Sequence, residues 1–313
     1  VDSLWNGDKD SIGTYQNLGF LEIHFDNISA DACEDYKRML RIDTAVHSTT
    51  FKSEGVTHLS EVFSSAPDSV LVASFFADKP ISGTIVLEDD LSGILKDRRA
   101  PYAGAKQVKK PKSNGKGTVL VYESRKSSQV TAKGSIISQD GVLANGLEYG
   151  SRVLARCSSG SITAKGKTLV FKDVENLELL IVADTNYKMS FKDHWRGAPV
   201  IPILDERIQS VAKKDLQSLK SSHVADYQSF YNHMKIDLGT TPKEIACLPT
   251  DERLSRIKEQ MPAKQKKGKT QDKRKIKSSS ELFPVLDEID LQQLIANNGR
   301  YLMITLSSPG SLL

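Results

Sequence analysis

The stretch from Tyr36 to Lys79 constrains the fold of this chain more than any other. Its β-branched and alternating residues predict strands over Thr44–Lys52, Val56–Phe63 and Ser69–Ala77. A Glu-Gly pair and a Pro-Asp pair separate them. These pairs favour turns, because glycine accepts a positive φ and proline cannot donate to a sheet ladder. Three strands joined by short turns indicate a β-meander in an antiparallel sheet.

The remainder of the first two thirds also predicts strands. Asn145-Gly146 and Lys165-Gly166-Lys167 predict turns, as does Asp140-Gly141. Lys96–Lys116, which contains two prolines, predicts an excursion over the surface instead of a strand. Many short strands at close spacing indicate a large all-β sandwich. The further predicted strands are Phe20–Phe25, Ile81–Glu88, Gly117–Glu123, Val130–Ser138, Leu147–Ser158, Ser161–Ala164, Thr168–Phe171 and Leu177–Ala183.

The pattern becomes helical in the last third. Asp184–Pro202 is irregular, with His194-Trp195-Arg196-Gly197 at its centre, and an amphipathic stretch begins at Leu204. Further helices are predicted from Thr250 and over Leu291–Leu306. A stretch from Leu216 to about Met234 places one set of residues on a single face, which we expect to pack under the sandwich: Leu219, His223, Tyr227, Phe230 and Tyr231. A histidine in such a place is expected to be a buried, hydrogen-bonded core residue and not a ligand.

The formal net charge of +4 belongs to one segment. Lys264–Lys277 holds eight basic residues against the single acid Asp272. A run without apolar periodicity cannot bury a core, so we expect a solvated, disordered insertion, or an artefact of the reading frame. A nucleic-acid-binding role acting through this run is the alternative, but the run lacks interleaved aromatic residues on which bases could stack.

Several classes of site are not indicated. No Gly-rich phosphate loop follows a strand, no His-Glu-x-x-His or Gly-x-Ser-x-Gly motif occurs, and no apolar run is long enough to span a membrane. The three cysteines are far apart and match no metal-ligand spacing, so no metal and no cofactor are predicted. Paired acids occur at Asp89-Asp90, Asp251-Glu252 and Asp287-Glu288, but adjacent side chains point apart on helices and strands, which makes a poor catalytic dyad.

Several segments, in the same order along the chain, resemble family 95 glycoside hydrolases, which are α-L-fucosidases and their relatives. Asn17, Phe20 and Ser308 depart from the residues usual in that family, and the family has a short acidic connection where this chain carries its lysine run. The matching segments are Tyr15-Gln16, Leu18-Gly19, Arg41–Ala45, Gly55–Thr57, Glu61–Phe63, Ser65–Asp68, Ala77–Lys79, His223–Gln228, Lys235–Gly239, Leu248–Leu254 and Gly299–Ile304.

The resemblance implies a mainly β architecture with four parts. Residues 1–186 are expected to form the N-terminal antiparallel β-sandwich (a supersandwich), and residues 187–260 a helical linker. Residues 261–280 form the basic insertion, and residues 281–313 begin a truncated (α/α)6 catalytic barrel. The sandwich is expected to dock on that barrel within the same protein, and without the barrel Leu291–Leu313 is expected to pack poorly and to promote aggregation.

The resemblance also implies a reaction, namely inverting hydrolysis of terminal α-L-fucosyl linkages. In inverting enzymes an acid and a base stand apart with a water between them. Here the resemblance implies a glutamic acid and an asparagine that is polarised by an acidic neighbour. All of these lie in the barrel and no position of this chain matches them, so this chain alone is expected to be inactive. Alternatives are the same scaffold in an α-L-galactosidase and a non-catalytic carbohydrate-binding sandwich.

One residue is a candidate substrate contact. Trp5 lies in a Leu-Trp-x-Gly segment like that of the family, and an aromatic face can stack on a sugar ring, although a packing role is the alternative. The expected partner is a fucosylated glycan bound through the barrel, with no nucleic acid and no membrane. Because the chain starts at Val1 within this motif, an export signal is expected to be missing, and a secreted or periplasmic location is favoured.

Overall fold

The computed structural model of this chain describes residues 18–26, 28–89, 94–95, 100–101, 106–111, 118–123, 127–143, 145–260 and 289–307. Trp5 and the lysine run lie outside these ranges. The chain divides into two compact units. The larger unit comprises Val1–Arg41 with Ala45–Asp226, and the smaller comprises Ile42–Thr44 with Tyr227–Leu313.

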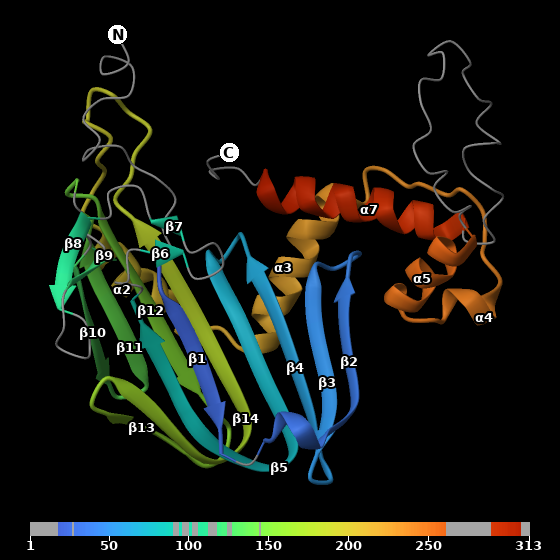
Figure 1. The fold of residues 1–313 in the computed structure, drawn as a ribbon, viewed down its shortest axis with the longest axis horizontal. Coiled ribbons are helices and arrows are strands. Elements are labelled where there is room, and N and C mark those ends of the chain that lie inside the picture. Colours follow the sequence, from blue (N-terminus) through green and yellow to red (C-terminus); the bar gives the residue numbers. More distant parts are fainter. Residues whose placement is uncertain are drawn as a thin grey trace. The chain divides into compact units, whose positions relative to one another are not determined.

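The larger unit is built on strands (Figure 1). These are β1 (Phe20–Phe25), β2 (Cys33–Arg41), β3 (Val46–Ser53), β4 (Val56–Ser65), β5 (Val70–Glu88), β6 (Ile94–Leu95), β7 (Ala100–Pro101), β8 (Lys106–Pro111), β9 (Thr118–Glu123), β10 (Ser127–Lys133), β11 (Ile136–Val142), β12 (Glu148–Arg156), β13 (Ser161–Lys165) and β14 (Thr168–Thr185). A short 3-10 helix, η1 (Ala30–Ala32), precedes β2. One 10-stranded antiparallel sheet has the order β10-β11-β12-β14-β5-β4-β3-β2, with β1 paired to β5 and β13 paired to β14. β6 pairs with β7, and β8 pairs with β9.

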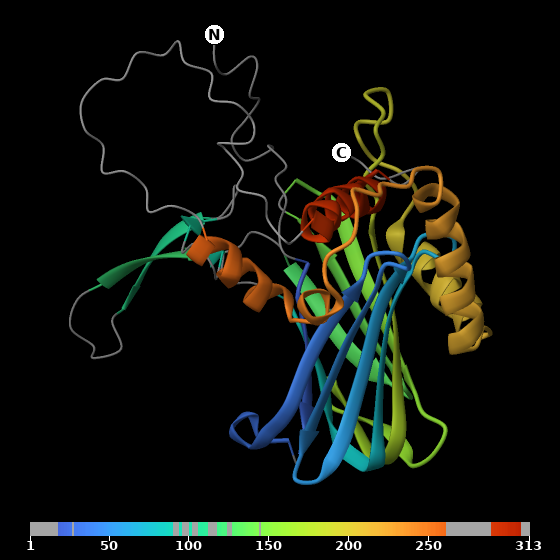
Figure 2. The same ribbon diagram turned by 90° about the vertical axis from the view of Figure 1, so that its right-hand side faces the viewer.

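Two long strands convert this sheet into a sandwich. The first half of β5 pairs with β4 and its second half with β1, while β14 pairs first with β13 and then with β12. The register between β5 and β14 shifts on both sides of Val174, and such irregularities bend strands. Gly83 lies at a close approach, since a Cβ there would clash with the carbonyl of His24 and the ring of Phe171. The strands form two facing layers (Figure 2). One apolar core of this unit contains Ala73, Ala77, Ile85, Leu87, Val153, Leu169, Phe171, Leu177 and Leu179.

The mainly β fold and the antiparallel sandwich are therefore confirmed, although several boundaries differ from the predicted ones. Ser69–Ala77 and Ile81–Glu88 are the two halves of β5, and the two predicted strands after residue 167 are the two halves of β14. The sequence predicts two separate strands in each case, whereas the β5–β14 ladder continues past the break with a shift in register, as in a bulge.

Three local predictions are wrong. The predicted strand Val130–Ser138 is a hairpin that turns at Gly134, where φ is 59°. Asp140-Gly141 is not a turn but part of β11, because Gly141 lies opposite Tyr149 and a Cβ there would clash with the tyrosine ring. Lys106–Pro111, within the predicted surface excursion, forms β8. β2 was missed altogether, since the charged sequence of an exposed edge strand carries little apolar alternation.

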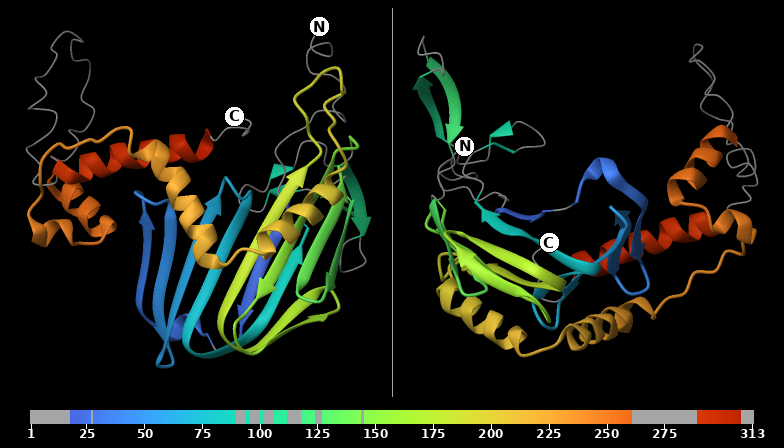
Figure 3. Two further views of the ribbon diagram at one scale, coloured as in Figure 1. Left: turned by 180° about the vertical axis from the view of Figure 1, so that it is seen from behind. Right: turned by 90° about the horizontal axis from the view of Figure 1, so that it is seen from below.

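Helices α2 (Val200–Ala212) and α3 (Leu216–Tyr231) follow the sheet. α2 covers the face of the sheet that points away from the sandwich core (Figure 3). It begins four residues before the predicted start, because Pro202 falls in the first turn, where a missing N–H removes no helical hydrogen bond. A second apolar core results, which contains Val46, Phe63, Val70, Val72, Leu180, Val182, Val200, Leu204, Ile208, Val211 and Leu219.

The smaller unit is helical. It contains the end of α3 and the helices α4 (Lys243–Ala246), α5 (Thr250–Gln260) and α7 (Ile289–Leu306), so the helices predicted from Thr250 and over Leu291–Leu306 are confirmed. The prediction that the last helix packs poorly is wrong at Leu291, which is 2% exposed, but Ile295, Leu302, Met303 and Leu306 are exposed. None of the described helices is long and apolar enough to cross a membrane.

Candidate functional site

The adjacent acid pairs noted in the sequence do not form a catalytic dyad in the residues that the structure describes. Asp89 follows β5 and accepts a hydrogen bond from the Tyr149 hydroxyl. Asp251 and Glu252 lie exposed in the first turn of α5, where acids complement the helix dipole. Asp90 and the pair Asp287-Glu288 fall outside the described ranges, as does Trp5.

His223 is a core residue, as predicted. Its side chain is buried, its Nε2 lies 3.3 Å from the carbonyl oxygen of Ala45, and its ring stacks on Phe63 with 5.1 Å between centroids. Ala45 directly precedes β3 and Phe63 lies on β4, so His223 fixes α3 against this part of the sheet. A buried imidazole that is already engaged on its ring face and edge is poorly placed to bind a ligand.

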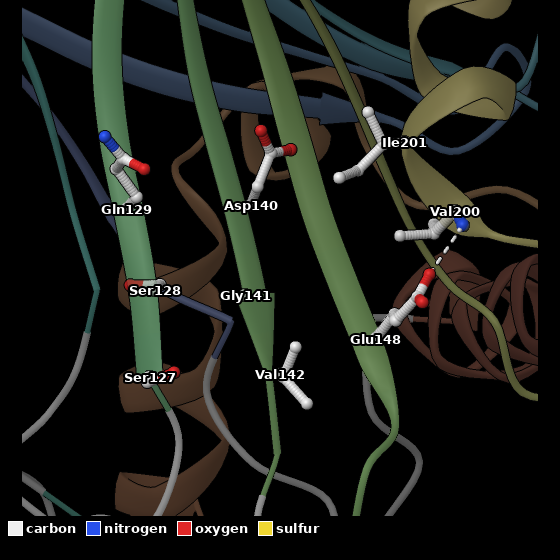
Figure 4. A pocket seen from close by; sticks show the side chains of 9 residues that line it. All are labelled: Ser127, Ser128, Gln129, Asp140, Gly141, Val142, Glu148, Val200 and Ile201. Atoms are coloured by element: carbon white, nitrogen blue, oxygen red, sulfur yellow. Dashed lines mark hydrogen bonds between the residues drawn. The ribbon is translucent and has the colours of Figure 1, made fainter.

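A cavity of about 360 Å³ lies where the ends of β10, β11 and β12 meet the start of α2 (Figure 4). It is lined by Ser127, Ser128, Gln129, Asp140, Gly141, Val142, Glu148, Val200 and Ile201. Two carboxylates border it, which is the first requirement for glycoside hydrolysis.

Both carboxylates are used by the fold. Glu148 Oε2 accepts the backbone N–H of Val200 at 3.1 Å and so satisfies a free donor at the start of α2 (Figure 4). Asp140 Oδ1 accepts from the Arg152 guanidinium at 2.7 Å. Protonation of either group in a catalytic cycle would weaken a structural contact, so we assign both to the scaffold.

Arg152 is the centre of this polar junction. It is only 3% exposed, on β12, and its Nε donates to Asp205 of α2 at 2.7 Å while its Nη1 donates to Asp140. Nη1 also reaches the backbone carbonyls of Gln139 and Ser151. A buried guanidinium that lies between two carboxylates and two carbonyls is well compensated, and it ties β11, β12 and α2 together.

A second set of charged contacts holds the end of α2. Arg156 Nε donates to Glu178 at 2.6 Å, and its Nη1 donates to the carbonyls of Ala212 and Lys214, where the helix leaves acceptors unpaired. Lys214 pairs with the carboxylate of Asp68, which also accepts from the Ser65 hydroxyl at 2.6 Å. Burial alone would raise the pKa of Asp68, but the bonds from Lys214 and Ser65 outweigh it, so the pKa lies below the ordinary value.

The sandwich interior contains one more polar group of residues. Buried Gln139 donates to the carbonyl of Leu18 at 3.0 Å and accepts from the Ser151 hydroxyl at 3.1 Å. Nearby on β12, burial and then the adjacent carboxylate of Asp89 raise the pKa of Tyr149. Gln139 and Ser151 thus supply hydrogen-bond partners to each other, which is what buried polar side chains require.

The smaller unit has a polar centre of its own. The Arg253 guanidinium of α5 donates to Asp290 of α7 at 2.6 Å, and the hydroxyl of Thr241 donates to the same carboxylate oxygen. Burial raises the pKa of Asp290, but Thr241 and Arg253 outweigh this effect and hold the pKa below its ordinary value. One carboxylate thus joins the loop before α4 to two helices.

Aromatic rings form the other contact of this unit. Tyr227 stacks on Tyr231 with 5.6 Å between centroids and donates its hydroxyl to the carbonyl of Ile42 at 2.8 Å. Arg300 of α7 lies 4.5 Å from the centre of the Tyr231 ring. Burial, followed by the neighbouring Tyr231 and Tyr301, raises the pKa of Tyr227 to about 12. Tyr227 is therefore a structural residue and not an acid–base group at neutral pH.

No metal site is indicated within the part of the chain that the structure describes, where no group of three or more His, Cys, Asp or Glu side chains is placed to hold an ion. Sequence reasoning had missed Arg152 and the Arg253–Asp290 pair. An arginine at a core position of an alternating strand was the available signal for Arg152. No sequence signal pointed to Asp290, because its partner Arg253 lies 37 residues away in the sequence.

Comparison with known proteins identifies the family. The Glycosyl hydrolase family 65, N-terminal domain matches residues 2–190, and the Glycosyl hydrolase family 95 catalytic domain matches residues 215–313. The first match covers the sandwich, and the second covers α3 and all helices after it.

Curated relatives agree with these two matches. The chain is 25% identical to "Alpha-L-fucosidase 2" of Arabidopsis thaliana over 306 residues and 28% identical to "Probable alpha-fucosidase A" of Aspergillus niger over 329 residues. These alignments cover 95% and 98% of this chain but 32% of each relative, so the chain spans about a third of their length.

Among solved structures, a protein of the human microbiome assigned as a kojibiose phosphorylase superposes with a TM-score of 0.43 and 14% identity, over 67% of this chain and 27% of its own. The two family matches lie in tandem and leave only a short stretch between them. The chain therefore belongs to the glycosyl hydrolases that carry the Glycosyl hydrolase family 65, N-terminal domain, and its last third is similar to the Glycosyl hydrolase family 95 catalytic domain.

Proposed function

We propose that this chain is the scaffold portion of an α-L-fucosidase, which hydrolyses terminal α-L-fucosyl linkages of glycans with inversion. The observation that carries the proposal is the alignment of nearly the whole chain with two proteins named as α-fucosidases, in which sandwich and first catalytic helices match together. In this proposal residues 1–186 form the sandwich and residues 187–260 the linker.

The acid and base of the reaction are proposed to come from the parts of the catalytic domain that the longer relatives possess. In support, the two carboxylates that border the cavity of the larger unit, Asp140 and Glu148, are engaged in bonds that hold α2. An inverting enzyme needs one carboxyl group that can donate a proton and another group that can activate water, on opposite sides of the sugar. On this basis the 313-residue chain alone is inactive.

The proposed role of the sandwich is to hold the first catalytic helix in place. α3 starts the segment that matches the catalytic domain, and Lys220 of α3 donates to Glu61 of β4 at 2.7 Å while His223 stacks on Phe63. The helix is thus attached to the sheet by charge and by ring packing. Rigid support of this kind is what a catalytic constellation requires.

Hydrolysis of an aryl α-L-fucoside tests the proposal. We expect the product of the whole reading frame that contains this chain to release the aryl alcohol, and proton NMR to show the inverted sugar anomer first. The 313-residue chain is expected to release none. An aryl α-L-galactoside is the second substrate to be tested. If it were hydrolysed faster than the fucoside, the proposed activity would be that of an α-L-galactosidase. Lack of activity on both substrates would refute it.

A further inference from the structure

A short hairpin between β14 and α2, residues 187–196, presents exposed aromatic side chains; we call it the aromatic hairpin. It extends beyond the ends of β12 and β14 (Figures 1 and 3). The rings of Tyr187 and Trp195 are nearly parallel, at 9°, with 6.3 Å between centroids, and Phe191 packs edge-on against Trp195 at 6.4 Å. Phe191 is 81% exposed, and Met189, Tyr187 and Trp195 are exposed as well.

Backbone hydrogen bonds make the hairpin rigid. Trp195 N–H donates to Ser190 at 2.9 Å, Lys188 N–H donates to Trp195, and the bridge between Tyr187 and Arg196 closes the base. The guanidinium of Arg196 donates to the carbonyl of Asn145 at 2.7 Å and so fixes the hairpin to the turn before β12. An ordered hairpin loses little conformational entropy when it binds a ligand.

The backbone conformation of the aromatic hairpin is also energetically unfavourable. His194 and Trp195 are consecutive non-glycine residues with φ of 51° and 60°, in the left-handed region that side chains rarely adopt. Strain of this kind persists where the surrounding structure enforces it, and it concentrates at binding sites. The indole of Trp195 contacts the rings of Tyr187 and Phe191 within the hairpin and belongs to neither apolar core.

Polar groups surround the rings. The Lys188 ammonium and the Asp193 carboxylate form an ion pair at 2.7 Å, with both side chains about half exposed, and His194 is exposed beside them. The hydrogen bond from Lys188 lowers the pKa of Asp193, with a smaller contribution from the Ser190 hydroxyl. Flat apolar rings bordered by hydrogen-bond donors and acceptors match a pyranose, which has an apolar C–H face and hydroxyl groups at its edge.

We propose that the aromatic hairpin is a glycan-binding platform on which a sugar ring of the substrate stacks against Trp195 and Phe191. This inference deepens the proposed function and rests on it for the class of ligand. Membership of the chain in the glycoside hydrolases favours a neutral saccharide over a lipid surface or a protein partner as the occupant of the platform.

Calorimetric titration of the 313-residue chain with a fucosylated lactose trisaccharide, and separately with lactose, tests the platform. We expect the unsubstituted chain to bind saccharide, and Trp195→Ala to weaken binding by roughly threefold to tenfold. Trp195→Phe, which retains a ring, is expected to recover most of that loss. Phe76→Ala on β5 is the matched control, since it removes another exposed ring of the larger unit and leaves the hairpin intact.

Three results would refute the proposed platform. They are absence of saccharide binding by the unsubstituted chain, equal weakening of binding by Phe76→Ala, and unchanged affinity in Trp195→Ala. A lower melting temperature of the longer protein on Trp195→Ala, with unchanged saccharide affinity, would identify the hairpin as a packing surface instead. Titration measures binding of lactose and of the fucosylated sugar and needs no catalytic activity. If the product of the whole reading frame hydrolysed neither aryl glycoside, the fucosidase proposal would be refuted, but saccharide binding by the aromatic hairpin would still be established by the titration.

Discussion

The two compact units are stabilised in different ways. In the larger unit apolar side chains such as Val72, Val153 and Leu179 are fully buried between two layers or under α2. In the smaller unit Leu291 is the one buried aliphatic residue among those described, and α7 exposes Ile295, Leu302, Met303 and Leu306. The larger unit is thus stabilised mainly by well-buried apolar cores. The second unit is held mainly by the Asp290 carboxylate and by stacked tyrosines.

Removal of a core side chain of the larger unit should have the largest effect. Leu179→Ala deletes a fully buried leucine of β14 and leaves a cavity between the layers, so we expect a loss of about 2–5 kcal/mol in the free energy of unfolding, measured by urea denaturation. Leu302→Ala on α7 is the matched control and should cost less than about 1 kcal/mol. Equal losses would mean that α7 contributes a core as well ordered as the sandwich.

Acid should weaken the contact that holds the smaller unit together. The pKa of Asp290 is lower in the folded chain than in the unfolded one, so the folded carboxylate binds its proton less readily. Its stabilisation is complete above the unfolded value of about 4 and is lost as the pH falls through the folded pKa. Asp290→Asn should therefore destabilise the smaller unit at pH 7 and have little further effect near pH 2.

Hydrogen exchange of amides in α5 and α7, compared between pH 7 and pH 3, measures this effect region by region. Asp251→Asn is the control, since that acid is exposed at the start of α5. A pH response of Asp290→Asn identical to that of the unsubstituted chain would show that Asp290 does not provide the contact. Asp68 of the larger unit also has a lowered pKa, but that unit contains two apolar cores, so we expect it to respond less to acid than the smaller unit.

The smallest effect on stability is expected on the exposed face of α7. Met303 is 70% exposed, so Met303→Ser should change the free energy of unfolding by less than about 0.5 kcal/mol while reducing association of the 313-residue chain, as seen by light scattering. Met234→Ser, also exposed but outside α7, is the control. Unchanged association would indicate that this face of α7 does not cause aggregation.

Alternation and turn chemistry were sufficient to predict most of the sandwich, because strands such as Val56–Ser65 have one face that points to an apolar core. They failed where tertiary contacts override local signals. Asp140-Gly141 has the sequence of a turn, yet glycine is needed at position 141 because the ring of Tyr149 on the next strand leaves no space for a Cβ atom. Edge strand β2 buries nothing and therefore leaves no pattern.

The site was harder to predict than the fold. Short-range patterns correctly placed His223 in a helix core, but the Arg152 junction and the aromatic hairpin depend on partners from separate strands and turns. His194-Trp195-Arg196-Gly197 stood out in the sequence, but only coordinates show that two of these residues adopt left-handed backbone angles. Spacing in sequence cannot encode such geometry, since it arises from hydrogen bonds within the loop.

The pairing of β5 with β14 has a consequence for biosynthesis. Leu71 lies opposite Ile181, so the central ladder of the sandwich cannot close until the ribosome has released the chain past Thr185. Until then β4 and the first half of β5 form a ribbon with one apolar edge uncovered, and contacts this distant in sequence form slowly. Nascent chains of this protein should therefore depend on chaperones for a long interval during translation.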